Sequence, residues 1–154
     1  MSKLVMERKA SDNKYLHRDF HISTDNGIGY VGDKYGDSGV EQLLREFSKK
    51  YFQKLVEKYA KEGLVAIKEY IENVYATEES EDAIEISLSE TVLNVKVKYC
   101  PAVQYMKSQG HTPSKWYKMS TSVVYDQLAK DCGIRFEMGE YNEENGQTEY
   151  SFYI

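Results

Sequence analysis

The spacing of apolar residues along this chain switches twice from a helical period to a strand period, and this pattern constrains the fold most strongly. Up to about residue 75, apolar residues recur about every 3.6 positions, as on one face of a helix. Residues 84–99 alternate apolar and polar, 101–133 return to the helical period, and 134–154 alternate again. Runs of helices beside antiparallel strands predict an α+β fold, with N-terminal helices, a β-hairpin, two helices and a second β-hairpin. We expect the hairpins to join into one four-stranded antiparallel sheet packed against the helices.

Three helices are predicted in the N-terminal half. The first covers about residues 15–35, although its glycines weaken it, and 36–39 form a break. The second covers 40–59 and is stopped by Gly63, and the third covers 64–75. The second helix has a continuous apolar stripe, which predicts one buried face: Val40, Leu43, Leu44, Phe47, Tyr51, Leu55 and Tyr59.

The rest of the chain is predicted to alternate between hairpins and shorter helices. The acidic run 78–82 is typical of a solvated loop. The expected elements are strands at 84–88 and 93–99, a helix from Pro101 to Gly110, a helix opened by Thr112–Pro113 and closed by Gly133, and strands at 134–138 and 150–154.

Composition limits the class of protein. The chain of 154 residues is long enough for one domain, which we place at 15–154 after a flexible, polar segment at 1–14. An excess of acidic over basic residues (25 against 20) argues against a nucleic-acid partner. No apolar run approaches about 18 residues, so no membrane partner is expected.

Two cysteines argue against a disulfide scaffold and predict a reducing, cytoplasmic location. The 14 tyrosines leave a homodimer interface open.

Cys100 is the strongest candidate for a reactive group. It follows a predicted strand and precedes Pro101, at the expected N-terminus of a helix. The unpaired N–H groups there lower the pKa of a cysteine and favour the nucleophilic thiolate. The alternative is a small side chain that packs at a strand–helix junction. Cys132, at the end of a predicted helix, is interpreted as a packing residue.

A second group of candidates lies near the start of the chain. His17 and His21 are four residues apart and share one helix face, with Asp19 between them. A metal would need further ligands that the spacing does not single out, so no metal or cofactor is predicted, and polar surface residues are the alternative. A histidine here is a candidate general base for a cysteine nucleophile. His17, Asn26 and Tyr30 are candidates for substrate binding beside His21.

Several short strings resemble one group of small bacterial proteins, those similar to L-2-amino-thiazoline-4-carboxylate hydrolase. The strings are Asp19-Phe20-His21, Gly27-Ile28-x-Tyr30, Tyr35-Gly36-x-x-Gly39-Val40, Val97-Lys98-Tyr99-Cys100-Pro101-Ala102, Glu140-Tyr141 and Asn145-Gly146. The resemblance covers about residues 15–154. It implies hydrolysis of a small ring or amide-type compound containing nitrogen or sulfur. It also implies that Cys100 is the nucleophile, with Asp19 and His21 as a base and its orienting partner.

The order of elements also resembles the 4-vinyl-reductase and TRAPP-type domains, which hold small or lipid-like ligands in an apolar pocket. Three functions therefore stay open: a hydrolase, a non-catalytic ligand-binding domain, and an oligomerisation or scaffold domain. The hydrolase predicts Cys100 near a histidine at a cavity that solvent reaches. The binding domain predicts a larger apolar cavity and an unreactive Cys100. The scaffold predicts no cavity and an exposed apolar patch.

Overall fold

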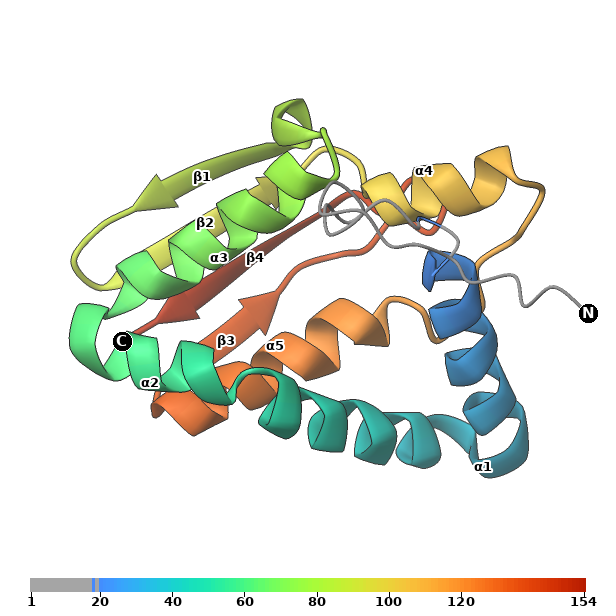
Figure 1. Ribbon diagram of the computed structural model, residues 1–154, viewed down its shortest axis with the longest axis horizontal. Helices are drawn as coiled ribbons and strands as arrows, with labels where there is room; N and C mark the ends of the chain where they lie inside the picture. Colours follow the sequence, from blue (N-terminus) through green and yellow to red (C-terminus); the bar gives the residue numbers. More distant parts are fainter. Residues whose placement is uncertain (1–17, 19) are drawn as a thin grey trace, which may run out of the picture.

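The computed structural model describes Arg18 and residues 20–154, and it confirms the predicted α+β fold (Figure 1). The predicted flexible segment 1–14 lies outside the described residues. None of the helices in the described part is long and apolar enough to span a membrane. The elements follow one another as α1 (Phe20–Tyr51), α2 (Gln53–Glu62), α3 (Leu64–Thr77), the short 3-10 helix η2 (Glu81–Ala83), β1 (Ile84–Leu88), β2 (Val92–Val97), α4 (Pro101–Ser108), α5 (Met119–Cys132), β3 (Arg135–Met138) and β4 (Thr148–Tyr153).

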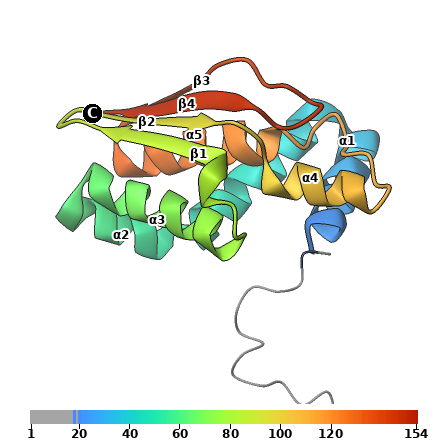
Figure 2. The same ribbon diagram turned by 90° about the horizontal axis from the view of Figure 1, so that it is seen from above.

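The two hairpins join into one antiparallel sheet with the strand order β1-β2-β4-β3. The central pairing places Val95 of β2 opposite Tyr150 of β4, and Val97 opposite Thr148. Figure 2 shows the helices gathered on one face of this sheet. Leu93, Val95 and Val97 are buried while the residues between them are more exposed, as expected for a sheet covered on one face.

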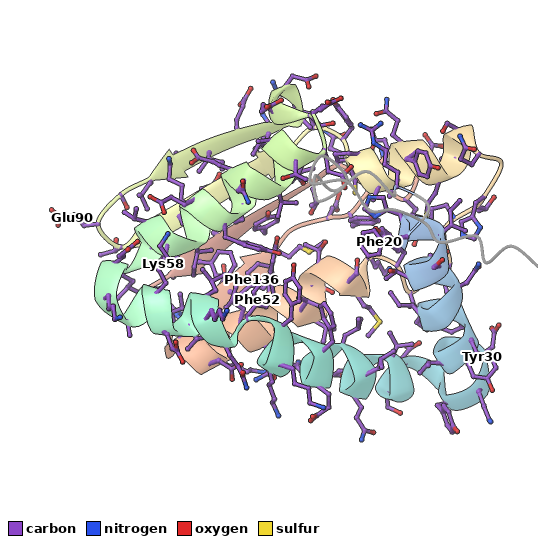
Figure 3. All side chains as sticks on the ribbon, in the orientation of Figure 1. Phe20, Tyr30, Phe52, Lys58, Glu90 and Phe136 are labelled. Atoms are coloured by element: carbon purple, nitrogen blue, oxygen red, sulfur yellow. The ribbon has the colours of Figure 1, made fainter. Side chains whose placement is uncertain are left out.

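Aromatic rings fill the core between the sheet and the helices. Tyr125 of α5 lies among them, with ring-centroid distances of 6.4 Å to Phe52, 6.0 Å to Phe136 and 5.7 Å to Phe152. Figure 3 shows Phe52 and Phe136 in the space between the helices and the strands. Tilted and edge-on ring pairs stabilise a core by about 0.5–1.5 kcal/mol beyond the burial of their area. Part of the tyrosine content therefore serves the core.

Helix α1 bends at Gly36, so the break predicted at 36–39 is confirmed as a kink. Gly36 has φ 71° and ψ −168°, a conformation that glycine adopts readily because it lacks a Cβ atom. The two arms of α1 are visible in Figure 1. The next predicted helix, 40–59, is divided at Phe52 between α1 and α2.

The second arm of α1 buries a different face from the predicted one. Leu43, Phe47 and Tyr51 were expected in the core but are 42%, 48% and 59% exposed. The buried positions recur every fourth residue: Val40, Leu44, Ser48 and Phe52. The small Ser48 allows α1 to approach α5, and its hydroxyl donates a 2.7 Å hydrogen bond to the Val124 carbonyl. This contact fixes the rotation of the helix and leaves the three larger side chains outside.

Helix α5 begins at Met119, so the predicted start at Thr112–Pro113 is wrong. Tertiary contacts hold the preceding segment as a loop against α1. The Trp116 indole packs on Gly32, where an added Cβ atom would lie 2.4 Å from the ring. The same indole donates a 2.7 Å hydrogen bond from Nε1 to Asp37.

Glycines end the two later helices as predicted. Gly110 follows α4 with φ 76°, and Gly133 follows α5 with φ 74°. A left-handed residue at this position allows the last carbonyl groups of a helix to be satisfied. The final strand ends earlier than expected, because Ile154 lies beyond β4 and is 63% exposed.

The contact between Trp116 and Gly32 gives a first prediction. Gly32→Ala is expected to lower the free energy of unfolding by about 1–3 kcal/mol, because the new methyl group would displace the indole. Urea denaturation measures this change. Gly27→Ala on the same helix is the matched control, because no atom lies within 4 Å of the added Cβ. The control is expected to stabilise the protein slightly, by up to about 1 kcal/mol. Equal effects of the two substitutions would contradict this account.

Candidate functional site

A small cavity of about 170 Å³ lies beneath the sheet. Its lining residues come from the start of α1, the end of α3, the end of β2, the start of α4, the first half of α5, and the loop that leads into β4. These elements can be followed in Figure 1. The pairing of Val97 with Thr148 brings the ends of both central strands to this wall. The cavity therefore forms at the point where the two hairpins meet.

Cys100 lies in the wall of this cavity, at the N-cap of α4. The Cys100 N–H donates a 2.7 Å hydrogen bond to the Asn145 carbonyl, which ties it to the loop before β4. Gly146 is packed so closely that an added Cβ atom would lie 2.4 Å from Cys100 Cβ. The backbone N–H groups of Val103 and Ala102, in the first turn of α4, lie near enough to the thiol to lower its pKa. The sequence correctly placed the cysteine at a helix N-terminus that opens with proline.

The electrostatic consequence of this position differs from the prediction. Burial raises the pKa of the Cys100 thiol, and this effect outweighs the lowering of that pKa by the Val103 and Ala102 N–H groups. The nearby Glu78 carboxylate raises the pKa of the thiol further. Burial therefore favours the neutral thiol over the expected thiolate at pH 7. Nucleophilic attack by Cys100 would require a base to take its proton.

His21 and Glu78 form a buried pair in the same wall. His21 Nε2 lies 2.7 Å from Glu78 Oε1, and the two side chains are only 10% and 9% exposed. His21 comes from the first turn of α1 and Glu78 follows the last turn of α3. Glu78 was assigned to the solvated loop 78–82, and for this residue the assignment is wrong. Nothing in a run of acidic residues distinguishes the one carboxylate that turns inward.

Five tyrosines supply much of the remaining wall: Tyr75, Tyr117, Tyr125, Tyr141 and Tyr150. Burial raises the pKa of Tyr125 to about 12, and it raises the pKa of Tyr75, Tyr141 and Tyr150 above the ordinary tyrosine value. The Tyr125 and Tyr150 hydroxyls are hydrogen-bonded to each other. These phenols stay protonated at neutral pH and act as neutral polar groups.

Thr148, the first residue of β4, also lines the cavity. The residue is 7% exposed, and its Oγ1 atom is buried without a hydrogen-bond partner among the described residues. Buried hydroxyl groups in folded proteins nearly always have a partner. Thr148 is thus a polar group of the wall that the described protein atoms leave unsatisfied.

Two of the other predicted site residues, Asn26 and Tyr30, do not line this cavity. Asn26 and Tyr30 are exposed on α1, and Figure 3 shows Tyr30 on the outer side of that helix. His17 and Asp19 lie outside the described residues, so their predicted roles stay predictions. The structure therefore brings together Cys100 and His21 from the predicted set.

Asp25 is a buried carboxylate that sequence reasoning missed. It is 2% exposed and lies 2.7 Å from His111 Nε2, and it accepts two hydrogen bonds of 3.0 and 3.1 Å from the Ser114 N–H. Asp25 holds the His111 side chain, which is only 22% exposed although it comes from a loop. The inward face of α1 follows His21, Asp25, Ile28 and Gly32, so Asn26 and Tyr30 are out of phase with it.

No metal centre is apparent in the described part of the chain, where histidine, cysteine and carboxylate side chains form no group of three or more that could hold an ion. Neither a protein-family model nor a curated protein matches this chain. The resemblance to the thiazoline carboxylate hydrolase group therefore stays a prediction.

The Asp25 contacts generate a second prediction. Asp25→Ala is expected to lower the free energy of unfolding by about 3 kcal/mol, because it leaves the buried Ser114 N–H and the His111 ring without their acceptor. The free energy is measured by urea denaturation at pH 7. Asp33→Ala, at an exposed position of the same helix, is the control and is expected to change it by less than about 0.5 kcal/mol. A loss below 1 kcal/mol for Asp25→Ala would show that the pair is not structural.

A third prediction concerns Cys100. In a Cys132→Ser protein, the rate of alkylation by iodoacetamide should rise with pH and reach half its maximum above the ordinary cysteine pKa of about 8.5. The midpoint of the alkylation rate shifts to higher pH because burial raises the pKa of Cys100, and the reactive thiolate is therefore populated only at higher pH. In the matched Cys100→Ser protein, Cys132 should respond at still higher pH, since burial raises its pKa to about 11. A plateau of Cys100 reactivity below pH 8 would contradict the neutral thiol.

Proposed function

We propose that this protein is a hydrolase that opens a small ring or amide-type compound containing nitrogen or sulfur, with Cys100 as the nucleophile and His21 as the base. One observation carries the proposal: the Cys100 thiol and the buried His21–Glu78 pair line the same cavity. The sequence resemblance to thiazoline carboxylate hydrolases suggests the same cysteine. The cavity also argues against the scaffold hypothesis, which requires none.

The size of the cavity favours a compact ligand. A cavity of about 150 Å³ is enough to hold one benzene-sized ring. The volume here is about 170 Å³, so a single five- or six-membered ring fits and a lipid-like chain does not. Of the two ligand classes that the sequence leaves open, a small ring compound is therefore favoured over a lipid-like ligand.

The chemistry follows from the neutral state of the thiol. His21 accepts the Cys100 proton as the sulfur adds to the amidine or amide carbon, and a carbon–sulfur bond forms. The proton then passes from His21 to the nitrogen or sulfur that leaves as the ring opens, and this breaks its bond to carbon. Water next attacks the same carbon and the bond to Cys100 breaks, which returns the thiol. The sum is one water consumed and one carbon–heteroatom bond hydrolysed.

The surroundings of these groups support that sequence of steps. Glu78 at 2.7 Å orients the His21 ring and stabilises its protonated form, in the manner of the third member of a catalytic triad. Protonated tyrosine hydroxyls in the wall are available to donate to charge that develops on the reacting nitrogen. The apolar surface between these groups lowers the local polarity and strengthens each of the interactions.

Binding without catalysis is the second candidate, and one observation favours it. Burial raises the pKa of Cys100, as expected for a thiol that packs in a ligand-binding wall and does not react. Both candidates use the same cavity, so they differ only in whether a bond is broken.

A fourth prediction separates them. A panel of five-membered cyclic amidines, including 2-amino-thiazoline-4-carboxylate, is incubated with the protein and the products are quantified by mass spectrometry. Cys100→Ser is expected to lower kcat/KM by at least about a thousandfold, while the control Cys132→Ser leaves it unchanged. Turnover that survives in Cys100→Ser would exclude the cysteine mechanism. Ring binding without turnover in the wild-type protein would favour the binding domain.

A further inference from the structure

The charges around the cavity define what kind of ligand it can accept. Among the described residues, the wall contains one carboxylate, Glu78, and one histidine, His21, but no lysine or arginine. With Glu78 ionised, this pair has a net charge of zero when the imidazole is protonated and minus one when it is neutral. The pair therefore offers an anionic ligand no net positive charge in either state, and placing a second negative charge beside the Glu78 carboxylate is energetically costly.

The N-terminus of α4 does not compensate for this. A helix N-terminus attracts anions through its free N–H groups and its partial positive charge. Here the Cys100 N–H already donates to the Asn145 carbonyl. Pro101, the first residue of α4, has no N–H group. Val103 is not part of the cavity wall, so of this first turn only the Ala102 N–H remains for a ligand in the cavity.

The tyrosines of the wall favour the opposite charge. Five of them line a space that holds a single ring: Tyr75, Tyr117, Tyr125, Tyr141 and Tyr150. The negative faces of aromatic rings attract cations within about 6 Å, and the attraction grows when the cation is desolvated. Glu78 places a carboxylate beside these rings, and this carboxylate favours a cation as well.

Thr148 adds a directional requirement. Its Oγ1 atom is buried and has no hydrogen-bond partner within the described part of the chain. A hydroxyl oxygen accepts a hydrogen bond from an N–H group, as does the Glu78 carboxylate. A ligand with two N–H groups could therefore donate to both wall residues, whereas a ligand that only accepts hydrogen bonds could pair with the Thr148 hydroxyl but not with the Glu78 carboxylate.

We infer that the cavity selects a small ring that carries a positive charge and N–H donors, such as a cyclic amidinium or guanidinium, and rejects carboxylates. The inference rests on the proposed function in that it specifies the substrate of the same site. It departs from the sequence resemblance, because the compound named by that resemblance bears a carboxylate. The preference for a cation is a property of binding and does not require hydrolysis.

A fifth prediction tests the preference with ligands matched in shape. 2-Aminoimidazoline is a cationic cyclic guanidine, 2-imidazolidinone is its neutral counterpart of equal size, and 2-imidazolidinone-4-carboxylate is anionic. Isothermal titration of the full wild-type chain at pH 7 is expected to give a Kd at least about tenfold lower for the cation than for the neutral ring. The anion is expected to bind more weakly than either.

Substitutions of two wall residues test whether these residues cause the preference for the cationic ring. Glu78→Gln removes the charge and is expected to reduce the preference for the cation to less than about threefold. Glu79→Gln is its matched control, because the neighbouring Glu79 side chain is 83% exposed. Thr148→Val keeps the shape of the side chain and is expected to weaken cation binding by about three- to tenfold. The Tm of each variant is measured, and Thr148→Val keeps the test valid if Glu78→Gln does not fold.

Each possible result either supports or overturns the inferred preference for cations. Equal or tighter binding of the neutral ring, no binding of either ring, or a preference that persists in Glu78→Gln would overturn the inference. Cation binding that depends on Glu78, with no hydrolysis of any cyclic amidine, would support the inference and overturn the hydrolase. Hydrolysis of neutral or anionic rings by Cys100 would overturn the inferred preference for cations and support the hydrolase.

Discussion

The pairing of β2 with β4 is the interaction on which the rest of the structure depends. It joins two strands that are separated by about 50 residues of sequence, and with them the two hairpins. The pairing extends from Val92 opposite Tyr153 to Val97 opposite Thr148. Without it each hairpin would be a two-stranded ribbon, which is marginally stable in water. The same register carries Cys100 to the Asn145 carbonyl just beyond the strand ends. The sheet and the cavity are therefore products of one set of backbone hydrogen bonds.

The order of helices and strands could be predicted because it depends on the local spacing of apolar residues. The switch of period, the helix-ending Gly63 and Gly133, and Pro101 after a strand all act through nearby backbone atoms. These features led to the α+β fold and to Cys100 at a helix N-terminus, both of which the structure shows.

The parts that could not be predicted depend on contacts between distant segments. Trp116 and Asp25 hold the segment before α5 against α1, which overrides the capping signal of Thr112–Pro113. Ser48, a polar residue, takes a core position because its hydroxyl reaches the Val124 carbonyl across 76 positions of sequence. Glu78 turns inward because His21 is there to pair with it. In each case the deciding partner is invisible to a local pattern.

The close contact between Gly146 and Cys100 has a consequence for how such a site can change. At that position the boundary of the cavity is peptide backbone, and the missing side chain is a steric requirement, because a Cβ atom would lie 2.4 Å from Cys100 Cβ. Peptide groups offer the same donors and acceptors whatever the sequence, so substitution cannot retune this side of the cavity. Divergence in ligand preference has to arise from the facing side chains of Tyr141 and Thr148 and from the tyrosines on the helices. The thiol thus faces peptide backbone on one side, which substitution leaves unchanged, and side chains on the other, where selection can act.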